Sequence, residues 1–184
     1  MAFWSAVRAY IAHPDPLVSA SNTIAFVVAA NQPFYPVYLY FVVGPDIGIS
    51  FLTFLSTPFF LAVPAVARRH SLLGRALLPM AGIANTILSA KAFGTASGVE
   101  LFLGPCVTIA ALSFHRAERW VMLVLVGLGL ATYLCLHGRY GAPLHLYSPD
   151  EYARFLSLNA FSVLTLAAFV GITFANAFAE DERA

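Results

Sequence analysis

One carboxylate, Glu100, lies inside a long apolar stretch that runs from Phe93 to His115. This stretch is long enough to cross a bilayer, which takes about 20 residues. Burying an ionised carboxylate near hydrocarbon costs at least about 2.5 kcal/mol, so Glu100 should face a helix bundle or a wet cavity and have a partner there. The chemistry expected of such a residue is recognition of a ligand or of an opposite charge.

Small and polar residues around Glu100 recur at helical spacing. At about 100° per residue they fall within one narrow arc of a helix. This arc contains Ser97, Glu100, Gly104, Thr108, Ala111 and His115. Apolar residues such as Leu101 and Ile109 cover much of the remaining surface. The spacing therefore predicts one helix whose polar arc faces protein and whose other side faces lipid.

A second polar group lies in the segment NQPFYPVYLY. Pro33 and Pro36 remove backbone donors and should kink or open the first apolar helix. Opened backbone at membrane depth is tolerated only where protein or a cavity covers it. Asn31 and Tyr35 then line a ligand site, or the tyrosines form a belt at the outer interface beside one interhelical hydrogen bond.

Three further polar residues lie near the expected centre or outer end of other apolar stretches. Asn85 shares a small, polar face of its helix, where close approach allows an interhelical hydrogen bond. Asn159 lies near the outer end of the last helix. Lys91 either extends to the lipid headgroups or pairs with Glu100 across the turn GTASG. The predicted ligand-binding residues are therefore Asn31, Tyr35, Asn85, Lys91, Glu100 and Asn159.

No catalytic or metal-binding motif is recognisable. HExxH, CxxC, a glycine-rich phosphate loop and clustered carboxylates are absent from the sequence. No two histidines on facing helices share a depth that would hold a haem. Cys106 and Cys135 should lie at different depths, which disfavours a disulfide. We therefore expect no enzyme activity of the chain by itself, no catalytic residue, no metal and no cofactor.

The composition is that of an integral membrane protein. Of the 184 residues, 60% are hydrophobic and only 10% charged, and the mean hydropathy is +0.78. Soluble domains carry about 25% charged residues. The net charge of +1 and the lack of a basic run argue against a nucleic-acid partner.

Turn signals divide the chain into six apolar segments, which predicts an all-α, polytopic membrane protein with one six-helix bundle. The expected crossings are Val18 to Val43, Ile47 to Ala67, Leu72 to Phe93, Gly98 to Phe114, Trp120 to Leu136 and Phe155 to Phe178. Residues 1–16 form an amphipathic interfacial segment, 17–179 the six-helix domain and 180–184 a short charged cytoplasmic tail. Ser148, followed by Asp150 and Glu151, predicts the start of the last helix.

Three segments carry a resemblance to a known family: the turn and helix GTASGVELFLGPC, the loop HRAER, and the last helix LSLNAFSVLTLAAFVGITFANAF with its charged exit. The pattern resembles the six-helix membrane sensor modules that precede bacterial class III adenylate cyclases, and more loosely those before some histidine kinases and diguanylate cyclases. The resemblance covers the C-terminal half well and the first half by helix count. No output domain follows Arg183, so we expect either a stand-alone member that acts on a separate cytoplasmic signalling protein or the receptor half of such a protein.

The resemblance implies a receptor in the bacterial inner membrane that receives a signal in the bundle and passes it through the last helix, usually as a dimer. We expect a small, lipophilic ligand in an outer-leaflet cavity. The alternative is a small transporter or a structural subunit of a membrane complex. Gly127 and Ala131 form a small-xxx-small pair that favours a homodimer, although such pairs also serve packing within one chain.

The basic residues predict that both termini are cytoplasmic, because Lys and Arg concentrate on that side. Three of them, Lys91, Arg139 and Arg154, fall on the other side, against seven on the cytoplasmic side. Those seven are Arg8, Arg68, Arg69, Arg75, Arg116, Arg119 and Arg183.

With Cys106 and Cys135 replaced by serine, an impermeant thiol reagent added to whole cells should label a cysteine placed between residues 138 and 150. It should spare a cysteine placed at the extreme C-terminus, because that end is expected in the cytoplasm. The reverse labelling pattern would overturn this topology.

Overall fold

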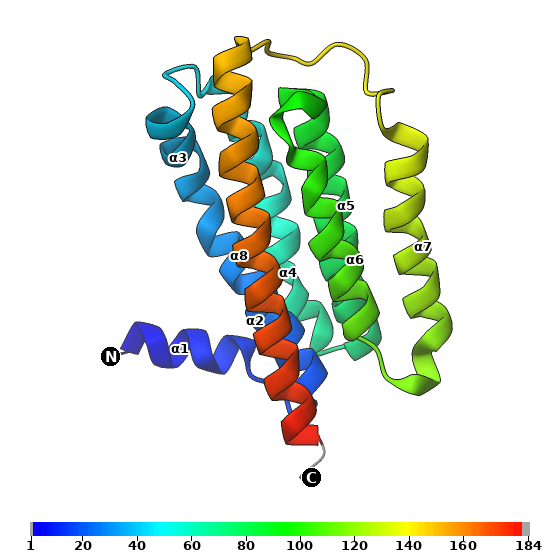
Figure 1. The fold of residues 1–184 in the computed structure, drawn as a ribbon. Coiled ribbons are helices and arrows are strands. Elements are labelled where there is room, and N and C mark those ends of the chain that lie inside the picture. Colours follow the sequence, from blue (N-terminus) through cyan, green and yellow to red (C-terminus); the bar gives the residue numbers. More distant parts are fainter. Residues whose placement is uncertain (1, 182–184) are drawn as a thin grey trace.

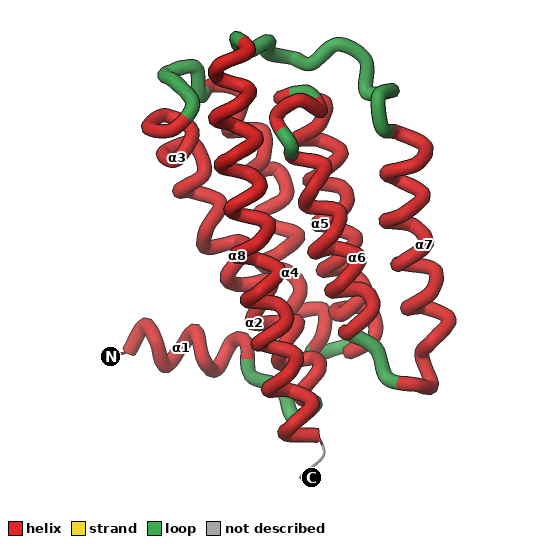
Figure 2. The backbone as a smooth tube through the Cα atoms, viewed as in Figure 1, coloured by secondary structure: helices red, strands yellow, loops and turns green. Residues whose placement is uncertain are grey.

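The computed structural model describes residues 2–181, and its regular elements within that range are all helical (Figures 1 and 2). The α-helices are α1 (Ala2–Ile11), α2 (Pro16–Asn31), α3 (Tyr35–Val42), α4 (Thr57–Ala67), α5 (Ser71–Phe93), α6 (Leu103–Leu112), α7 (Arg119–Leu136) and α8 (Pro149–Asp181). The 3₁₀-helices are η1 (Gln32–Phe34), η2 (Gly48–Ser56), η3 (Thr95–Ser97), η4 (Val99–Phe102) and η5 (Arg116–Glu118). The all-α prediction is confirmed. Residues 182–184 of the predicted charged tail lie outside the described residues.

Several helical stretches have the length and apolar character that crossing a membrane requires. Among the described residues there are four of them: Gly48–Ala67, Ser71–Phe93, Arg116–Leu136 and Pro149–Ala179. The other two predicted crossings consist of shorter pieces, namely α2 with η1 and α3, and the apolar helix Val99–Leu112. The chain therefore has the helices of a membrane protein.

Helix α1 projects sideways from the bundle at the end where α2 begins (Figure 1). Arg68 fixes α1 there: its Nη2 donates to the carbonyls of Ala9 and Tyr10 at 3.0 and 2.9 Å. The Tyr10 hydroxyl in turn donates to the Leu61 carbonyl at 2.6 Å. Phe3, which is exposed, lies on the part of α1 that projects from the bundle.

The predicted break in the first apolar helix is confirmed. Helix α2 ends at Asn31, η1 follows over one turn, and α3 begins at Tyr35. Pro33 has no N–H to donate, so the α-helical ladder cannot continue through it. Gln32 is buried at this break, and its side chain holds the opened segment against η2.

The predicted polar arc around Glu100 is wrong. Gly98 has a left-handed backbone with φ of +76°, and η4 has about 3.0 residues per turn, so the 100° spacing does not run through from Ser97 to His115. In α6 the expected protein-facing residues Gly104 and Thr108 are exposed, whereas Ile109 is buried. A Cβ on Gly98 would lie 2.5 Å from Leu156 Cδ1, so this turn also lets the chain approach α8 closely.

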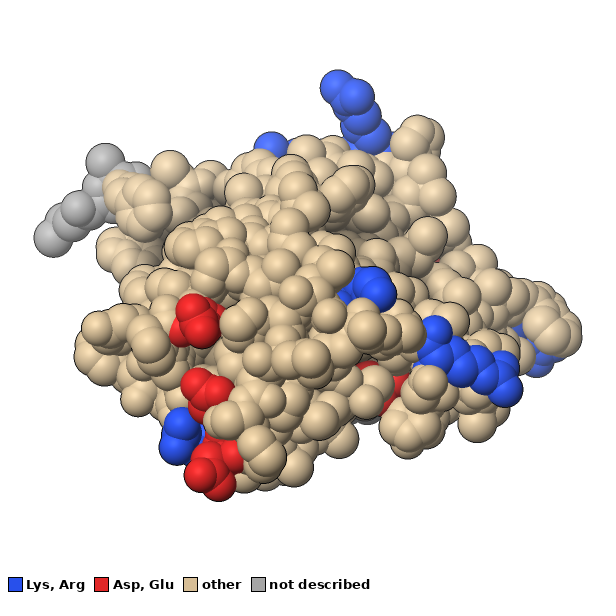
Figure 3. Space-filling view, turned by 90° about the horizontal axis from the view of Figure 1, so that it is seen from above, with Lys and Arg blue, Asp and Glu red and all other residues tan. Residues whose placement is uncertain are grey.

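The two ends of the bundle differ in charge. Arg8 lies in α1, and the α4–α5 and α6–α7 connections are at the same end of the bundle (Figure 1). Arg68, Arg75, Arg116 and Arg119 lie in these connections or within the first turns of the helices that follow them. The opposite end, which carries the long loop between α7 and α8, shows only scattered charged side chains (Figure 3). These five of the seven basic residues grouped for the topology prediction therefore lie at one end of the bundle, and Arg183 lies outside the described residues.

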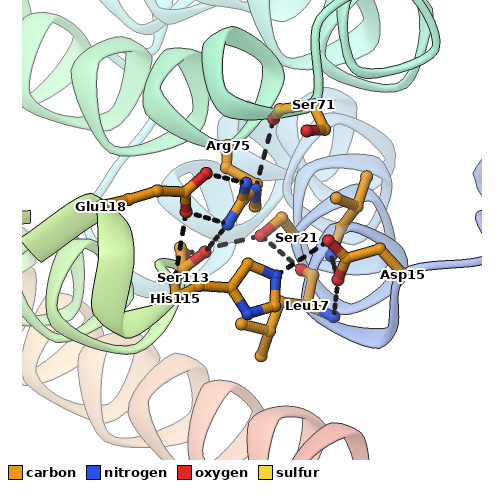
Figure 4. A network of polar contacts seen from close by, with 9 residues as sticks. Asp15, Leu17, Ser21, Ser71, Arg75, Ser113, His115 and Glu118 are labelled. Atoms are coloured by element: carbon orange, nitrogen blue, oxygen red, sulfur yellow. Dashed lines mark hydrogen bonds and ion pairs between the residues drawn. The ribbon is translucent and has the colours of Figure 1, made fainter. Parts of the chain in front are cut away.

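A buried arginine joins α5 to the connection between α6 and α7 (Figure 4). Arg75 is 1% exposed, and its two terminal nitrogens donate to the two carboxylate oxygens of Glu118, each at 2.7 Å. Nη1 also donates to the Ser113 carbonyl at 2.9 Å, and the guanidinium lies 5.5 Å from the centre of the Phe114 ring. A bidentate pair with these extra contacts compensates for burying the charge.

The same network reaches the start of α2. His115 Nε2 lies 3.0 Å from Asp15 Oδ2, and the other carboxylate oxygen of Asp15 accepts from the amides of Leu17 and Val18. Burial raises the pKa of Asp15, but the hydrogen bonds from His115, Val18 and Leu17 outweigh it and lower the pKa below its ordinary 3.8. This helix cap is therefore lost only as the pH falls through the lowered pKa.

Glu118→Gln should lower the free energy of unfolding by about 3 kcal/mol, because it leaves the buried Arg75 without a counter-charge. Arg116→Gln, an exposed charge change in the same turn, should change it by no more than about 0.5 kcal/mol. Unfolding of the purified protein in detergent measures both. Equal effects of the two variants would show that the Arg75 pair does not hold this end together.

Candidate functional site

A cavity of about 540 Å³ lies inside the bundle. Its volume is in the range of about 300–1,000 Å³ that is typical of small-molecule sites. Most of its wall is apolar, with Phe60 from α4, Leu78 from α5, Ile109 from α6 and Phe169 from α8. Helices α2 and α3 and the 3₁₀ segments η1, η2 and η4 complete the wall. The cavity therefore lies between segments that are far apart in the sequence.

Three of the six predicted ligand-binding residues line this cavity: Asn31, Tyr35 and Asn85. Asn159 lies beside it. Lys91 and Glu100 belong to a separate polar cluster beneath the long loop. The structure thus divides the predicted site into a cavity and a cluster.

A chain of hydrogen bonds lies behind the polar part of the cavity wall, to which Gln32 and Asn85 belong. Gln32 Nε2 donates to the hydroxyl of Ser56 at 2.5 Å, and the Thr57 hydroxyl donates to Gln32 Oε1. Ser56 Oγ lies 2.9 Å from Asn85 Oδ1 and donates to it. The Ser56 hydroxyl also lies 2.7 Å from the Thr53 carbonyl, so its single proton is shared between two acceptors. This chain links the opened segment η1 to α5 through η2.

Gln32 and Ser56 were not among the predicted ligand-binding residues. Gln32 directly follows Asn31 and precedes Pro33, so its place at the helix break was the available signal. Ser56 is 6% exposed, and its hydroxyl donates to the Thr53 carbonyl in its own helix and to Asn85 on α5. Because η2 is a 3₁₀-helix with about 3.0 residues per turn, its side chains point in other directions than in an α-helix, and the Ser56 hydroxyl faces inward.

Asn159 ties three elements together beside the cavity. Its Oδ1 accepts from the Tyr35 hydroxyl at 3.1 Å, and its Nδ2 donates to the Ser97 carbonyl at 2.8 Å. The side chain is fully buried. Asn159 therefore orders α3, α8 and η3 around the cavity and is itself a positioning residue.

Glu100 has a partner, as expected, but the partner is His137 at the end of α7. Glu100 is 7% exposed, and its Oε2 lies 2.7 Å from His137 Nδ1. Lys91 Nζ instead donates to the carbonyls of Tyr140 and Ala142 at 3.2 and 2.7 Å, so the alternative in which Lys91 pairs with Glu100 is wrong. The long loop folds back over the end of α5 and supplies these carbonyls.

Two buried oxygen atoms of this cluster have no hydrogen-bond partner within residues 2–181: Glu100 Oε1 and the Tyr140 hydroxyl. Burial raises the pKa of Tyr140 to about 12, and the adjacent charge of Glu100 adds to the rise. The Tyr140 hydroxyl and the Glu100 carboxylate are therefore close enough to interact directly. This cluster fastens the loop to the bundle.

The cavity offers hydrogen bonds without charge. None of the described residues that line it is Asp, Glu, Lys, Arg or His. Across residues 2–181, no group of three or more His, Cys, Asp or Glu side chains has a spacing that would hold a metal ion. The arrangement suits binding of an uncharged or weakly polar molecule.

Glu100→Gln should lower the free energy of unfolding by about 1.5–3 kcal/mol, the usual value of a hydrogen bond to a charged group. Asp46→Asn is the matched control, because Asp46 lies 3.9 Å from His145 at an exposed position. We expect a loss of no more than about 1 kcal/mol there. Thermal unfolding in detergent measures both. If Glu100→Gln melts at the temperature of the parent protein, the contact between Glu100 and His137 does not stabilise the fold.

Comparison of the chain with protein-family models, with curated proteins and with solved structures finds no match.

Proposed function

We propose that the chain is a receptor-like membrane module that binds a small, lipophilic ligand in the cavity and signals through α8. The observation that carries the proposal is the cavity of about 540 Å³, apolar for most of its wall and polar at a few fixed positions. Binding sites for small molecules have this character.

Helix α8 is suited to transmit occupancy of the cavity. One stripe of it, including Leu158, Ser162 and Leu166, lines the cavity, and the helix continues without interruption to Asp181 at the opposite end. At about 1.5 Å per residue its 33 residues span roughly 50 Å. A shift at the cavity therefore moves the end of α8 as a rigid element.

We further propose six membrane crossings, an interfacial α1 and cytoplasmic termini in a bacterial inner membrane. The exposed Phe3 and Trp4 on α1 support an interfacial helix, because aromatic side chains prefer the headgroup region. The basic residues at the α1 end support the orientation. The cavity then lies nearer the outer leaflet.

A cytoplasmic signalling protein and a second copy of the chain are the proposed partners, as the resemblance to cyclase-linked sensor modules suggests. Gly127 and Ala131 are exposed on α7, and a Cβ on Gly127 would meet nothing within 4 Å. The small-xxx-small pair is therefore free for a neighbouring helix. A monomeric mass in nanodiscs would contradict the homodimer.

The second candidate is a small transporter, which the opening of the cavity at the bundle surface favours. Val27, Asn31, Tyr38, Phe161 and Thr165 line the cavity and are also exposed. A transporter would carry the bound molecule across the membrane, whereas a receptor would hold it.

The test adds a set of long-chain lipophiles that differ in head group to the protein in nanodiscs and in proteoliposomes. We expect at least one to raise the melting temperature, to shift the distance between spin labels at Asn176→Cys and Ala117→Cys by about 1–2 Å, and to show no saturable uptake. Cys106→Ala and Cys135→Ser remove the other thiols.

Ser162→Phe, which fills the cavity, should abolish both responses, whereas Ser157→Phe outside it should not. Saturable uptake would favour the transporter. Failure of every lipophile to stabilise the parent protein would contradict a ligand site of either kind.

A further inference from the structure

Asn85 and Ser89 on α5 present unused hydrogen-bonding groups to the cavity. Asn85 uses its Oδ1 to accept from Ser56, while its Nδ2 has no acceptor among the described residues. Ser89 is 6% exposed, and its hydroxyl makes no hydrogen bond within residues 2–181. Residues four apart on a helix have Cβ atoms roughly 5–6 Å apart on one face, so one ligand atom or two neighbouring ones can reach both.

An unused polar group in an apolar wall is unusual. Most buried polar side chains have a partner, and one without it loses the hydrogen bonds that it made in water. The other polar groups nearby are occupied: Gln32 and Ser56 bond to one another, and Thr86 donates to the Gly82 carbonyl. Apart from the Asn31 amide at the exposed rim, the free N–H and O–H donors of the wall therefore concentrate at Asn85 and Ser89, which selects a ligand atom that accepts.

Charge in the ligand is disfavoured by the same wall. With no ionisable side chain of the acidic, basic or histidine type along it, a carboxylate or ammonium would be buried without a counter-charge. A carbonyl or ether oxygen requires only the donors that are present.

The opening of the cavity indicates the route of entry. The lining residues that are also exposed are Val27, Asn31, Tyr38, Phe161 and Thr165. All of them belong to α2, α3 or α8, so the opening lies between α8 and the helix pair α2 and α3. These surfaces are apolar beyond the rim, as Phe34 and Leu164 illustrate.

We propose that the cavity takes an uncharged, long-chain lipophile with a carbonyl-type head, which enters sideways from the bilayer between α8 and the α2–α3 pair and accepts hydrogen bonds from Asn85 and Ser89. The proposal rests on the proposed function, since it specifies the ligand of the same cavity. Its chemistry is that of a neutral ketone, ester or quinone head on an apolar body.

The test uses a long-chain ketone that carries a photoreactive diazirine near its tail, in nanodiscs. Labelling of cavity residues such as Ile109 and Leu166 is mapped by peptide mass spectrometry, and competitors of equal chain length reduce it. In the parent protein 2-tridecanone should compete about tenfold better than tridecane, the factor that one net hydrogen bond supplies. Tridecanoate and tridecylammonium should compete at least tenfold more weakly than the ketone.

Ser89→Ala should bring the ketone and the hydrocarbon to within about threefold of one another, because it deletes a hydroxyl that has no protein partner. Ser157→Ala, on α8 outside the cavity, should keep the parent ratio. Asn85→Leu should act like Ser89→Ala, with the exposed Asn176→Leu as its control. If Asn85→Leu does not fold, the result for Ser89→Ala decides. Each ratio compares the ketone with the hydrocarbon in the same variant, so differences in how the two competitors partition into the membrane cancel between variants.

The route of entry is tested by the onset of labelling. Thr165→Trp at the rim should slow it several-fold, whereas Leu164→Trp, exposed next to it but outside the cavity, should not. An unchanged onset in Thr165→Trp would overturn the sideways route.

The outcomes separate the two proposals. Three outcomes would overturn the ligand class but not the binding cavity. They are competition that does not depend on the head group, stronger competition by a charged head group, and an unchanged ratio of ketone to hydrocarbon in Ser89→Ala. Labelling of cavity residues that no competitor reduces would contradict the proposed function itself.

Discussion

The constraint on which the structure depends is that polar groups in an apolar bundle must find partners inside the protein. The break at η1 frees backbone and brings the Gln32 amide into the bundle, where water cannot satisfy it. Thr57 and Ser56 take up that amide, and Ser56 extends the bonding to Asn85. Because these contacts hold η1, η2 and α5 at fixed positions, they also keep the adjacent cavity wall in place.

The two other polar groups act at opposite ends of the bundle. Arg75 and Glu118 join α5 to the α6–α7 connection at the end that carries α1. Glu100 and His137 join η4 to the end of α7 beneath the long loop. These charged or strongly polar contacts fix the helices relative to one another at both ends of the bundle. The helices can therefore stay apart around the cavity in the apolar middle. The cavity is thus framed by pairs that do not line it.

The sequence predicted much of the fold, because apolar stretches and proline breaks act locally. The helix break at Pro33 and the start of α8 after Ser148 were readable in this way. The partner of Glu100 was not readable, since His137 is distant in the sequence and a long loop had to fold back to engage Lys91. The 3₁₀ segments η2 and η4 also changed which residues face inward, and helical spacing alone does not reveal such segments.

The most direct test of the central claim is a density map of the protein isolated from its native membrane and kept in nanodiscs. We expect elongated non-protein density in the cavity, with one end against Asn85 and Ser89 and the other leading toward the opening beside Thr165. A cavity filled by rearranged side chains of α5 and α8, with no density between them, would contradict it.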